Sequence, residues 1–546
     1  MLRTLVVLAS LTAFSGCGEV DDPPGGNGAG GSGGTGGGAV VVGEIGPIEW
    51  SSCDGGGPQL RCAEIDVPLD WTDSKSERIG VFLRKWETQA TTRRGQMWLL
   101  QGGPGFGAED LIGYAPYFAA EGFDVYLPDY RGVGRSTPLS CVGEEDSYDV
   151  STACIREIVD RWGDGVRFFS SADAAIDIGK EIEALRGDDD VFVMGVSYGT
   201  FVANKLLALF PDLLSGAVLD SICSATGCSI HTERNLNHSA ERVFDLCGTD
   251  PDCSARLSAD PWGKLADLMD RLEAGHCSDF AGKYTPYYAA QLLASSVDVR
   301  KLVPVALATA YRLDRCDPED VAALKHFLTQ ANSIFAFAPA TRASYSAFTY
   351  FNLFIHEFWD EGMEVGDFLD EVKPLVIQTG TTQSLVKALG RFEEVPSWSV
   401  PESLRRWADV ATPLLLLNGD LDARTPVQDL EGIEQAFSRP HQTWVEVPFG
   451  GHGIITEGTG SGRLPTCGYQ MITSFLAKPT KAPDTTCLTG MGTLDLAGDS
   501  LPAETIFGTS DLWENGVSKI RAPLVPDPAF DLAWQRLRER FGRPMP

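Results

Sequence analysis

One serine of this chain lies in a sequence pattern that is typical of a nucleophile. The segment 195–199, Gly-Val-Ser-Tyr-Gly, has the form G-x-S-x-G, and it stands between the apolar run Val191–Met194 and a helical run that begins at Thr200. In such a strand–turn–helix context the glycines permit a strained turn that lifts the serine hydroxyl out of a sheet. Ser197 is therefore predicted to attack an acyl carbon.

A serine hydroxyl is a weak nucleophile, so it needs a general base and a carboxylate that orients the base. His452 stands in a glycine-rich loop just after the apolar run Thr443–Val447, and none of the other six histidines has a comparable setting. The run Leu414–Leu417 is followed by Asp420 and Asp422, and the spacing does not choose between these two acids. The order serine, aspartate, histidine along the chain is that of the α/β hydrolases.

The oxyanion of a tetrahedral intermediate needs two preorganised N–H donors. The N–H of Tyr198, directly after the nucleophile, is the first candidate. The second is expected in the loop that follows an early strand, and the glycine-rich segment Gln101–Gly105 follows the apolar run Met97–Leu100. Glycine in that loop would let the backbone approach a substrate closely.

These residues require a sheet to position them, and the apolar pattern predicts one. Short runs rich in valine, leucine and phenylalanine recur before residue 222 and after Pro413; several are unbroken, as expected for strands that are buried on both faces of a parallel sheet. Between the two regions, apolar residues recur at helical spacing. The first part of the core is predicted over residues 46–222, and a helical insert over 223–408 precedes the acid-bearing strand. The second part of the core is predicted over 409–487, and an extension over 488–546 with one helix near Pro528–Phe541.

The N-terminus is typical of an export signal that ends in a lipid-attachment cysteine. A short apolar run, Leu5–Phe14, precedes the small pair Ser15-Gly16 and then Cys17, and this run is too short to span a membrane. We expect a signal peptide over residues 1–16, acylation of Cys17, and a glycine-rich tether over residues 17–45 that holds the protein to the bacterial cell envelope. Ordinary export with an incidental cysteine is the alternative.

Apart from Cys17 the chain has twelve cysteines, an even number, which in an exported protein predicts up to six disulfides. No two cysteines have the C-x-x-C spacing of a zinc site and no histidine pair lies beside them, so no metal is expected. No cofactor is expected either, because the predicted serine chemistry needs none. Pairing each cysteine with the next is the simplest prediction: Cys53–Cys62, Cys141–Cys154, Cys223–Cys228, Cys247–Cys253, Cys277–Cys316 and Cys467–Cys487.

The charge balance excludes one large class of partners. The chain has 44 Lys and Arg against 75 Asp and Glu, a formal net charge of −31, and no cation-rich run. Nucleic-acid binding is not expected, because phosphate contacts need clustered cations. The expected partners are a peptide substrate and, through Cys17, a membrane; the oligomeric state stays open.

Four segments resemble the prolyl- and tripeptidyl-aminopeptidase branch of the α/β-hydrolase serine peptidases. They are the early strand Cys62–Asp70, the Gly-Gly-Pro-Gly loop 102–105, the D-x-R-G-x-G-x-S segment 129–136, and the segment 195–199. The resemblance runs from about residue 48 to about residue 490. It implies an α/β-hydrolase fold: a mostly parallel central sheet with helices on both faces, and a cap formed by the helical insert.

The resemblance also implies roles for single residues. The family pattern G-x-x-D-x-x-T-P begins at Gly419 and falls on Asp422, which implies Asp422 as the acid and His452 as the base. It implies the N–H groups of Gly103 and Tyr198 as the oxyanion donors. Gln101 departs from the family, because the prolyl branch usually has histidine there. Cys467 and Cys487 are implied to belong to the C-terminal region typical of the tripeptidyl branch.

An exopeptidase must also hold the ammonium of its substrate, and acidic residues recur in the relatives near Glu357. Glu357 is therefore the candidate for this contact, with an exposed helical glutamate as the alternative. The predicted function is a serine exopeptidase that releases short peptides or single residues from free N-termini. An esterase on the same residues is the alternative, because a fold does not fix the substrate, and a non-catalytic binding lipoprotein is a third.

Overall fold

The computed structural model describes residues 42–53, 57–144, 149–333, 345–360, 362–458, 465–499 and 501–515. Two compact units, Met1–Gly38 and Ala39–Pro546, make up the chain, and every described residue belongs to the second. The predicted signal peptide, Cys17, most of the tether and the helix expected near Pro528–Phe541 lie outside the described residues.

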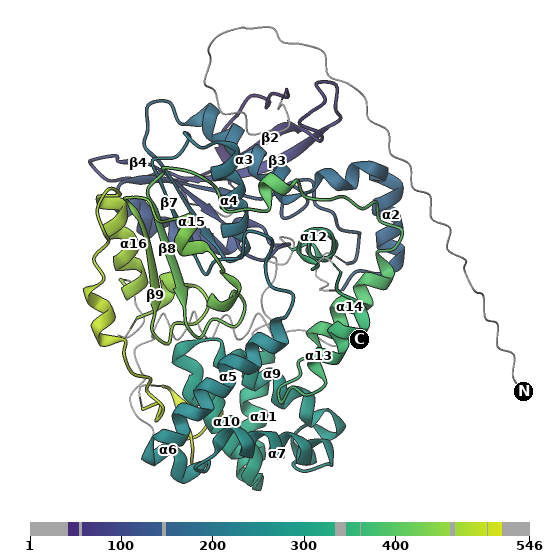
Figure 1. Ribbon diagram of the computed structural model, residues 1–546, viewed down its shortest axis with the longest axis vertical. Coiled ribbons are helices and arrows are strands. Elements are labelled where there is room, and N and C mark those ends of the chain that lie inside the picture. The colour runs from purple at the N-terminus through teal and green to yellow at the C-terminus, as the bar shows by residue number, and fades with distance from the viewer. Residues whose placement is uncertain are drawn as a thin grey trace, which may run out of the picture. The chain divides into compact units, whose positions relative to one another are not determined.

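A nine-stranded sheet runs through the centre of the unit, in the order β1-β2-β3-β5-β4-β6-β7-β8-β9 (Figure 1). The first three strands and the β3–β5 pair are antiparallel, whereas all neighbours from β5 to β9 are parallel. This confirms the predicted mostly parallel α/β sheet. The strands are β1 (Ser51–Ser52), β2 (Leu60–Pro68), β3 (Arg78–Trp86), β4 (Gly95–Leu100), β5 (Phe123–Pro128), β6 (Val191–Val196), β7 (Gly216–Asp220), β8 (Leu414–Gly419) and β9 (Gln442–Val447).

Helices cover both faces of this sheet, as the fold prediction expected. Side chains alternate along each strand, so Trp98 and Leu100 of β4 join the apolar cluster of α3 and α4, while Met97 and Leu99 join that of α1 and α16. Continuous apolar runs such as β4 therefore bury every residue. The core helices are α1 (Ala115–Ala120), α2 (Thr152–Trp162), α3 (Ser171–Leu185), α4 (Tyr198–Leu209), α15 (Ile433–Ala436) and α16 (Cys467–Ala477).

The strand order sets where chemistry can occur. The chain passes from β4 to β5 on one side and returns to β6 on the other side of β4. In open parallel sheets, ligands bind at the carboxyl ends of strands where the order reverses in this way. The loop with Gly103 follows β4 and Ser197 follows β6, so the strand order places both at the reversal.

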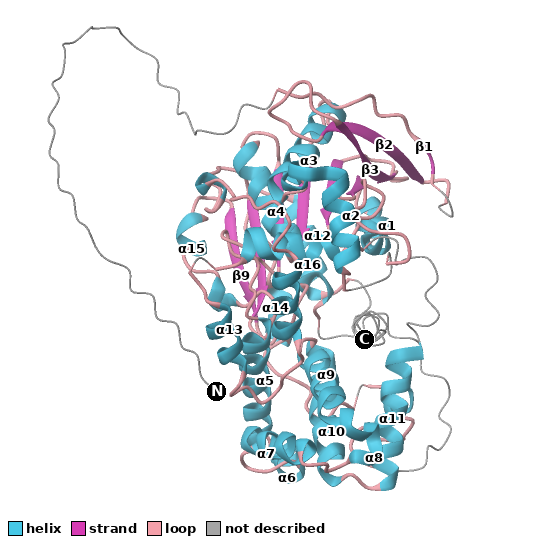
Figure 2. Cartoon of the chain, turned by 90° about the vertical axis from the view of Figure 1, so that its right-hand side faces the viewer, coloured by secondary structure: helices cyan, strands magenta, loops and turns pink. Residues whose placement is uncertain are grey.

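The segment between β7 and β8 contains helices joined by loops, and in its described parts the β-structure is limited to isolated bridges at Ser224, Gly227 and Tyr345. Its first helices pack on one another around an apolar cluster of their own, rich in alanine and leucine, and Figure 2 shows α5 to α11 as a group. The helices are α5 (Thr232–Thr249), α6 (Pro251–Arg256), α7 (Pro261–Glu273), α8 (Ser278–Ala281), α9 (Thr285–Val297), α10 (Val303–Arg315), α11 (Pro318–Ser333), α12 (Ala347–Leu353), α13 (Val365–Val372) and α14 (Thr381–Arg391).

Residues 491–515 pack against this insert, which the weak periodicity of the segment did not predict. Ile506 and Phe507 of α17 (Ala503–Phe507), together with Trp513, enter the apolar cluster of the insert. The buried guanidinium of Arg312 donates to the backbone oxygens of Leu512, at 2.8 Å, and Glu514, at 3.0 Å. One buried cation thus satisfies the carbonyl groups of an irregular segment.

The twelve described cysteines form six disulfides, and every predicted pair is confirmed. Each disulfide joins one cysteine to the next cysteine along the chain, with sequence separations of 5 to 39 residues. Within the described part of the chain, no helix combines the length and the apolar character needed to cross a membrane.

Candidate active site

Ser197 lies in the turn between β6 and α4 with φ 57° and ψ −126°, a left-handed conformation that a residue other than glycine rarely adopts. The two flanking glycines make the turn possible. A Cβ atom on Gly195 would lie 2.3 Å from the carbonyl oxygen of Gly199, and one on Gly199 would lie 2.2 Å from that of Leu100. The G-x-S-x-G pattern is therefore a steric requirement of this turn.

Asp422 and His452 form a direct pair. Nδ1 of His452 lies 2.9 Å from Oδ2 and 3.0 Å from Oδ1 of Asp422. Oδ2 also accepts from the hydroxyl of Thr425 at 2.7 Å, and Oδ1 accepts from the N–H of Arg424 at 2.9 Å. Burial raises the pKa of Asp422, but the pull of His452 and the hydrogen bonds outweigh it, so the pKa lies below its usual value. An ionised Asp422 directs the proton of His452 to Nδ1 and leaves Nε2 as the basic nitrogen.

Asp420, the other acid that the spacing allowed, has a different role. Its carboxylate accepts from the N–H of Phe449 at 2.6 Å and from the Nη2 of Arg242 at 3.1 Å. It therefore joins the loop after β8 to the loop after β9. The structure places Asp422, as the resemblance implied, and not Asp420, against His452.

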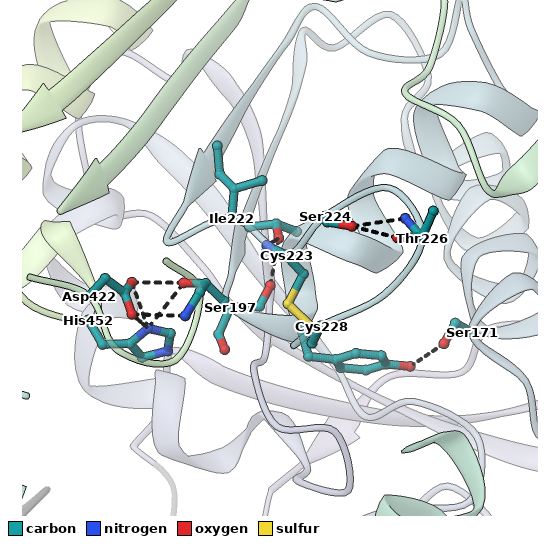
Figure 3. The surroundings of a disulfide bond; sticks show 12 residues. Ser171, Ser197, Ile222, Cys223, Ser224, Thr226, Cys228, Asp422 and His452 are labelled. Atoms are coloured by element: carbon teal, nitrogen blue, oxygen red, sulfur yellow. Dashed lines mark hydrogen bonds and ion pairs between the residues drawn. A yellow bond between two sulfur atoms is a disulfide. The ribbon is translucent and has the colours of Figure 1, made fainter. Parts of the chain in front are cut away.

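Figure 3 shows the side chains of Ser197, Asp422 and His452 gathered in one part of the view, next to the Cys223–Cys228 disulfide. The strands explain this grouping. Ser197, Asp422 and His452 follow β6, β8 and β9, and the carboxyl ends of parallel strands share one edge of the sheet. Residues more than 250 positions apart in the sequence are brought together in this way.

The glycine-rich loop after β4 passes directly over Ser197. A Cβ atom on Gly102 would lie 3.1 Å from Cβ and 3.6 Å from Oγ of Ser197. The N–H of Gly102 donates to Oε1 of Gln101 at 2.9 Å, whereas the N–H groups of Gly103 and Tyr198 donate to none of the described residues. Both remain available to an oxyanion.

The D-x-R-G-x-G-x-S segment, residues 129–136, supports this loop and is not part of the Asp422–His452 pair. Asp129 accepts from the N–H of Ala108 and from the guanidinium of Arg84, both at 2.7 Å. The buried Arg131 forms an ion pair with Asp177 at 2.6 Å. The contact of Asp129 with Ala108 fixes the chain just beyond the Gly-Gly-Pro-Gly loop, and the Arg131–Asp177 pair joins the segment to α3.

Glu357 lies in a π-helical turn, Phe354–Phe358, and is only 1% exposed, so the alternative of an exposed helical glutamate is wrong. Its Oε1 accepts from the N–H of Ser171 at 2.9 Å, while Oε2 has no hydrogen-bond partner among the described residues. Burial raises the pKa of Glu357, although Lys205 and Ser171 lower it. A substrate could reach this carboxylate only if neighbouring residues moved.

The insert contributes contacts that the sequence did not reveal. Asp298, after α9, pairs with Arg424 of the acid loop, and its backbone oxygen accepts from the N–H of His452 at 3.5 Å. Arg300 donates to the backbone oxygen of Pro448 at 2.8 Å. The insert is therefore tied to the loops of both Asp422 and His452. No sequence signal marked these residues, since single charges in a helical region have no distinctive spacing.

Lys205, on α4, gives a stability prediction. It is fully buried, donates to the backbone oxygen of Leu404 at 3.0 Å, and lies over the ring of Phe201. Burial lowers its pKa from 10.5 to about 8. Because Lys205 then binds fewer protons in the folded state than in the unfolded state, its contribution to the free energy of unfolding is least favourable below pH 8 and becomes more favourable towards pH 10.

We expect Lys205→Met to raise the free energy of unfolding at pH 7 by about 2 kcal/mol: about 3 kcal/mol from removing the buried charge, less about 1 kcal/mol for the lost hydrogen bond. At pH 10 the variant and the wild type should be equally stable. Urea denaturation at pH 7, 8, 9 and 10 measures the difference. A difference that does not change with pH would contradict the buried charge as its cause.

Comparison with known proteins agrees with this geometry. Residues 97–248 match the family model described as the alpha/beta hydrolase fold. The chain is 28% identical over 237 residues to the putative hydrolase YuaR of Escherichia coli, covering 36% of this chain and 46% of that one. It is 24% identical over 250 residues to the serine protease Hip1 of Mycobacterium tuberculosis, covering 39% and 47%.

A third relative is the tripeptidyl aminopeptidase of Streptomyces coelicolor, 27% identical over 220 residues, which cover 35% of this chain and 40% of the relative. The chain thus spans less than half the length of each of these three relatives. The sheet order, the strained turn at Ser197 and the match over residues 97–248 show that this chain has the α/β-hydrolase fold.

Proposed function

We propose that this chain is a serine exopeptidase that releases short peptides or single residues from free peptide N-termini. The observation that carries the proposal is the Asp422–His452 pair, at 2.9 Å, on the same sheet edge as Ser197 in its strained turn. The peptidase assignment is supported by the relatives named serine protease Hip1 and tripeptidyl aminopeptidase.

The geometry supports the following reaction. Nε2 of His452 accepts the hydroxyl proton as Oγ of Ser197 attacks the scissile carbonyl carbon, while Asp422 stabilises the imidazolium. The oxyanion accepts hydrogen bonds from the N–H groups of Gly103 and Tyr198. His452 then gives its proton to the leaving amine, the C–N bond breaks, and water attacks the acyl-enzyme with His452 again as the base.

We further propose that the protein is exported and held to the cell envelope by an acyl chain on Cys17. Six disulfides fit an oxidising compartment. We expect full-length protein in the producing cells to sediment with membranes and Cys17→Ser to be released into the soluble fraction, because the acyl chain is lost. Fractionation followed by mass spectrometry of the N-terminal peptide measures both. An unmodified Cys17 would contradict the anchor.

The second candidate is a carboxylic ester hydrolase on the same residues. The burial of Glu357 favours it, because no carboxylate is open to a substrate ammonium at that position. The deciding experiment compares, with the full chain in mild detergent, a free tripeptide anilide, its N-acetylated twin, a prolyl anilide and a short acyl ester. Cleavage of the free tripeptide but not its twin supports the exopeptidase; cleavage of the ester alone overturns it.

A variant tests whether Glu357 binds the ammonium. If neighbouring residues move and the substrate ammonium binds Glu357, Glu357→Gln should lower kcat/KM for the free tripeptide anilide by about 10- to 100-fold and leave ester cleavage within about twofold, because only the tripeptide has an ammonium that loses its partner carboxylate. Glu181→Gln is the matched control, since Glu181 is equally buried but lies on α3; it should change neither substrate. An equal loss on both substrates would show that Glu357 is structural.

A further inference from the structure

The last residue of β7, Asp220, touches two of the loops that carry the proposed catalytic residues. Its side chain is completely buried. Its backbone oxygen accepts from the N–H of Ser197 at 2.9 Å. Its carboxylate accepts from the N–H of Ile454 through Oδ1, at 2.7 Å, and from that of Ile455 through Oδ2, at 2.8 Å. The same residue therefore holds the turn at Ser197 and the chain just after His452.

The next residue extends this junction to the acid-bearing strand. The N–H of Ser221 donates to the backbone oxygen of Leu417, in β8, at 2.8 Å. Its hydroxyl accepts from the N–H of Gly453, adjacent to His452, at 2.7 Å, and donates to Oδ1 of Asp220 at 3.2 Å. Strand β7 lies between β6 and β8 in the sheet, so its carboxyl end is the one place from which both neighbours can be reached.

Asp220 is bonded as an ionised group. Both of its oxygens only accept hydrogen bonds, which is the pattern of a carboxylate. The N–H groups that it binds open the 3-10 turn Ile454–Thr456, and such N–H groups favour an anion. Burial raises the pKa of Asp220 above its usual value, although these hydrogen bonds and the positive charge of His452 partly offset the increase. The negative charge of Asp220 would attract the imidazolium that forms during the proposed reaction.

The other carboxylates around the His452 loop each have contacts of their own. Asp422 contacts the Nδ1 of His452 directly. The carboxylate of Asp298 is paired with Arg424, which offsets its charge. Glu457 accepts from the N–H of Gly451, at 3.3 Å. Asp220 differs from these groups because it comes from β7, the strand next to β8, and binds the chain just after His452.

We propose that Asp220 is a positioning residue of this site: its carbonyl fixes the turn of Ser197, and its carboxylate fixes the His452 loop and stabilises the imidazolium as it forms. The inference rests on the proposed serine-hydrolase function. It assigns to β7 a part in the reaction that neither the G-x-S-x-G pattern nor the acid and base loops reveal.

The test is Asp220→Asn in the full chain, with kcat and KM measured from pH 5 to 9 on whichever substrate of the four the wild type cleaves. We expect kcat to fall at least about tenfold with KM within about twofold, because the loop that carries the base is loosened. The midpoint of the acidic limb should move down by about one pH unit, since the imidazolium loses a nearby negative charge. A lower kcat with an unmoved limb would mean a merely structural role and would overturn the proposal.

Ser221→Ala is the companion variant, because it removes a neutral contact to the same loop. We expect kcat to fall about three- to tenfold with the acidic limb unchanged, and this variant decides the matter if Asp220→Asn does not fold. Wild-type kcat in a folded Ser221→Ala would then overturn the proposal. A wild type that cleaves none of the four substrates and reacts with no fluorophosphonate probe would overturn the proposed function, and this inference with it.

Discussion

Replacing Ser197 with alanine is expected to lower kcat by about 10⁴-fold or more and to abolish covalent labelling by a fluorophosphonate probe. The loss follows from chemistry alone, because alanine keeps the Cβ atom that the turn already accommodates at φ 57°. The free energy of unfolding should therefore stay within about 0.5 kcal/mol of the wild type. Gel-based labelling and active-site titration measure the first effect, and urea denaturation measures the second.

Ser224→Ala is a suitable control for this variant. Ser224 lies in the same view as the site in Figure 3, but among the described residues its hydroxyl is hydrogen-bonded only to the hydroxyl of Thr226, at 2.8 Å, and to the N–H of Thr226. It should be labelled as fast as the wild type. Persistent labelling of Ser197→Ala would mean that another serine is the nucleophile, whereas a well-folded wild type that is never labelled would favour the non-catalytic alternative.

Replacing Asp422 with asparagine is expected to lower kcat by about 10⁴-fold at pH 7. The side-chain amide would donate an N–H to Nδ1 of His452, and the imidazole proton would then be on Nε2. A protonated Nε2 cannot accept the hydroxyl proton of Ser197. The folded state should also lose stability, because the carboxylate has a lowered pKa; that contribution is present above the unfolded pKa and is lost as pH falls through the folded value.

Asp420→Asn is the matched control, two residues away on the same loop. Asp420 holds Phe449 and Arg242 rather than His452, so we expect kcat to fall less than about tenfold. Steady-state kinetics on the cleaved substrate, together with circular dichroism of both variants, separate the two effects. Similar losses in both variants would mean that the loop as a whole, rather than the Asp422–His452 contact, limits the reaction.

Patterns among neighbouring residues were sufficient to predict several features of this chain. Val191–Met194 predicts a strand, the glycines on each side of Ser197 predict the turn, and the unbroken apolar runs predict a parallel sheet. The six disulfides were also predictable, because each joins a cysteine to the next cysteine along the chain. These features follow from local backbone sterics, side-chain periodicity and short loop closure.

Tertiary structure alone decided which groups meet across the fold. The residue spacing left Asp420 and Asp422 open, and only the conformations of two loops place one against His452 and the other against Phe449. The burial of Glu357 likewise depends on contacts with α3. The ion pair between Asp298 and Arg424 and the contact of Asp220 with Ile454 join residues more than a hundred positions apart, and no local pattern encodes such contacts.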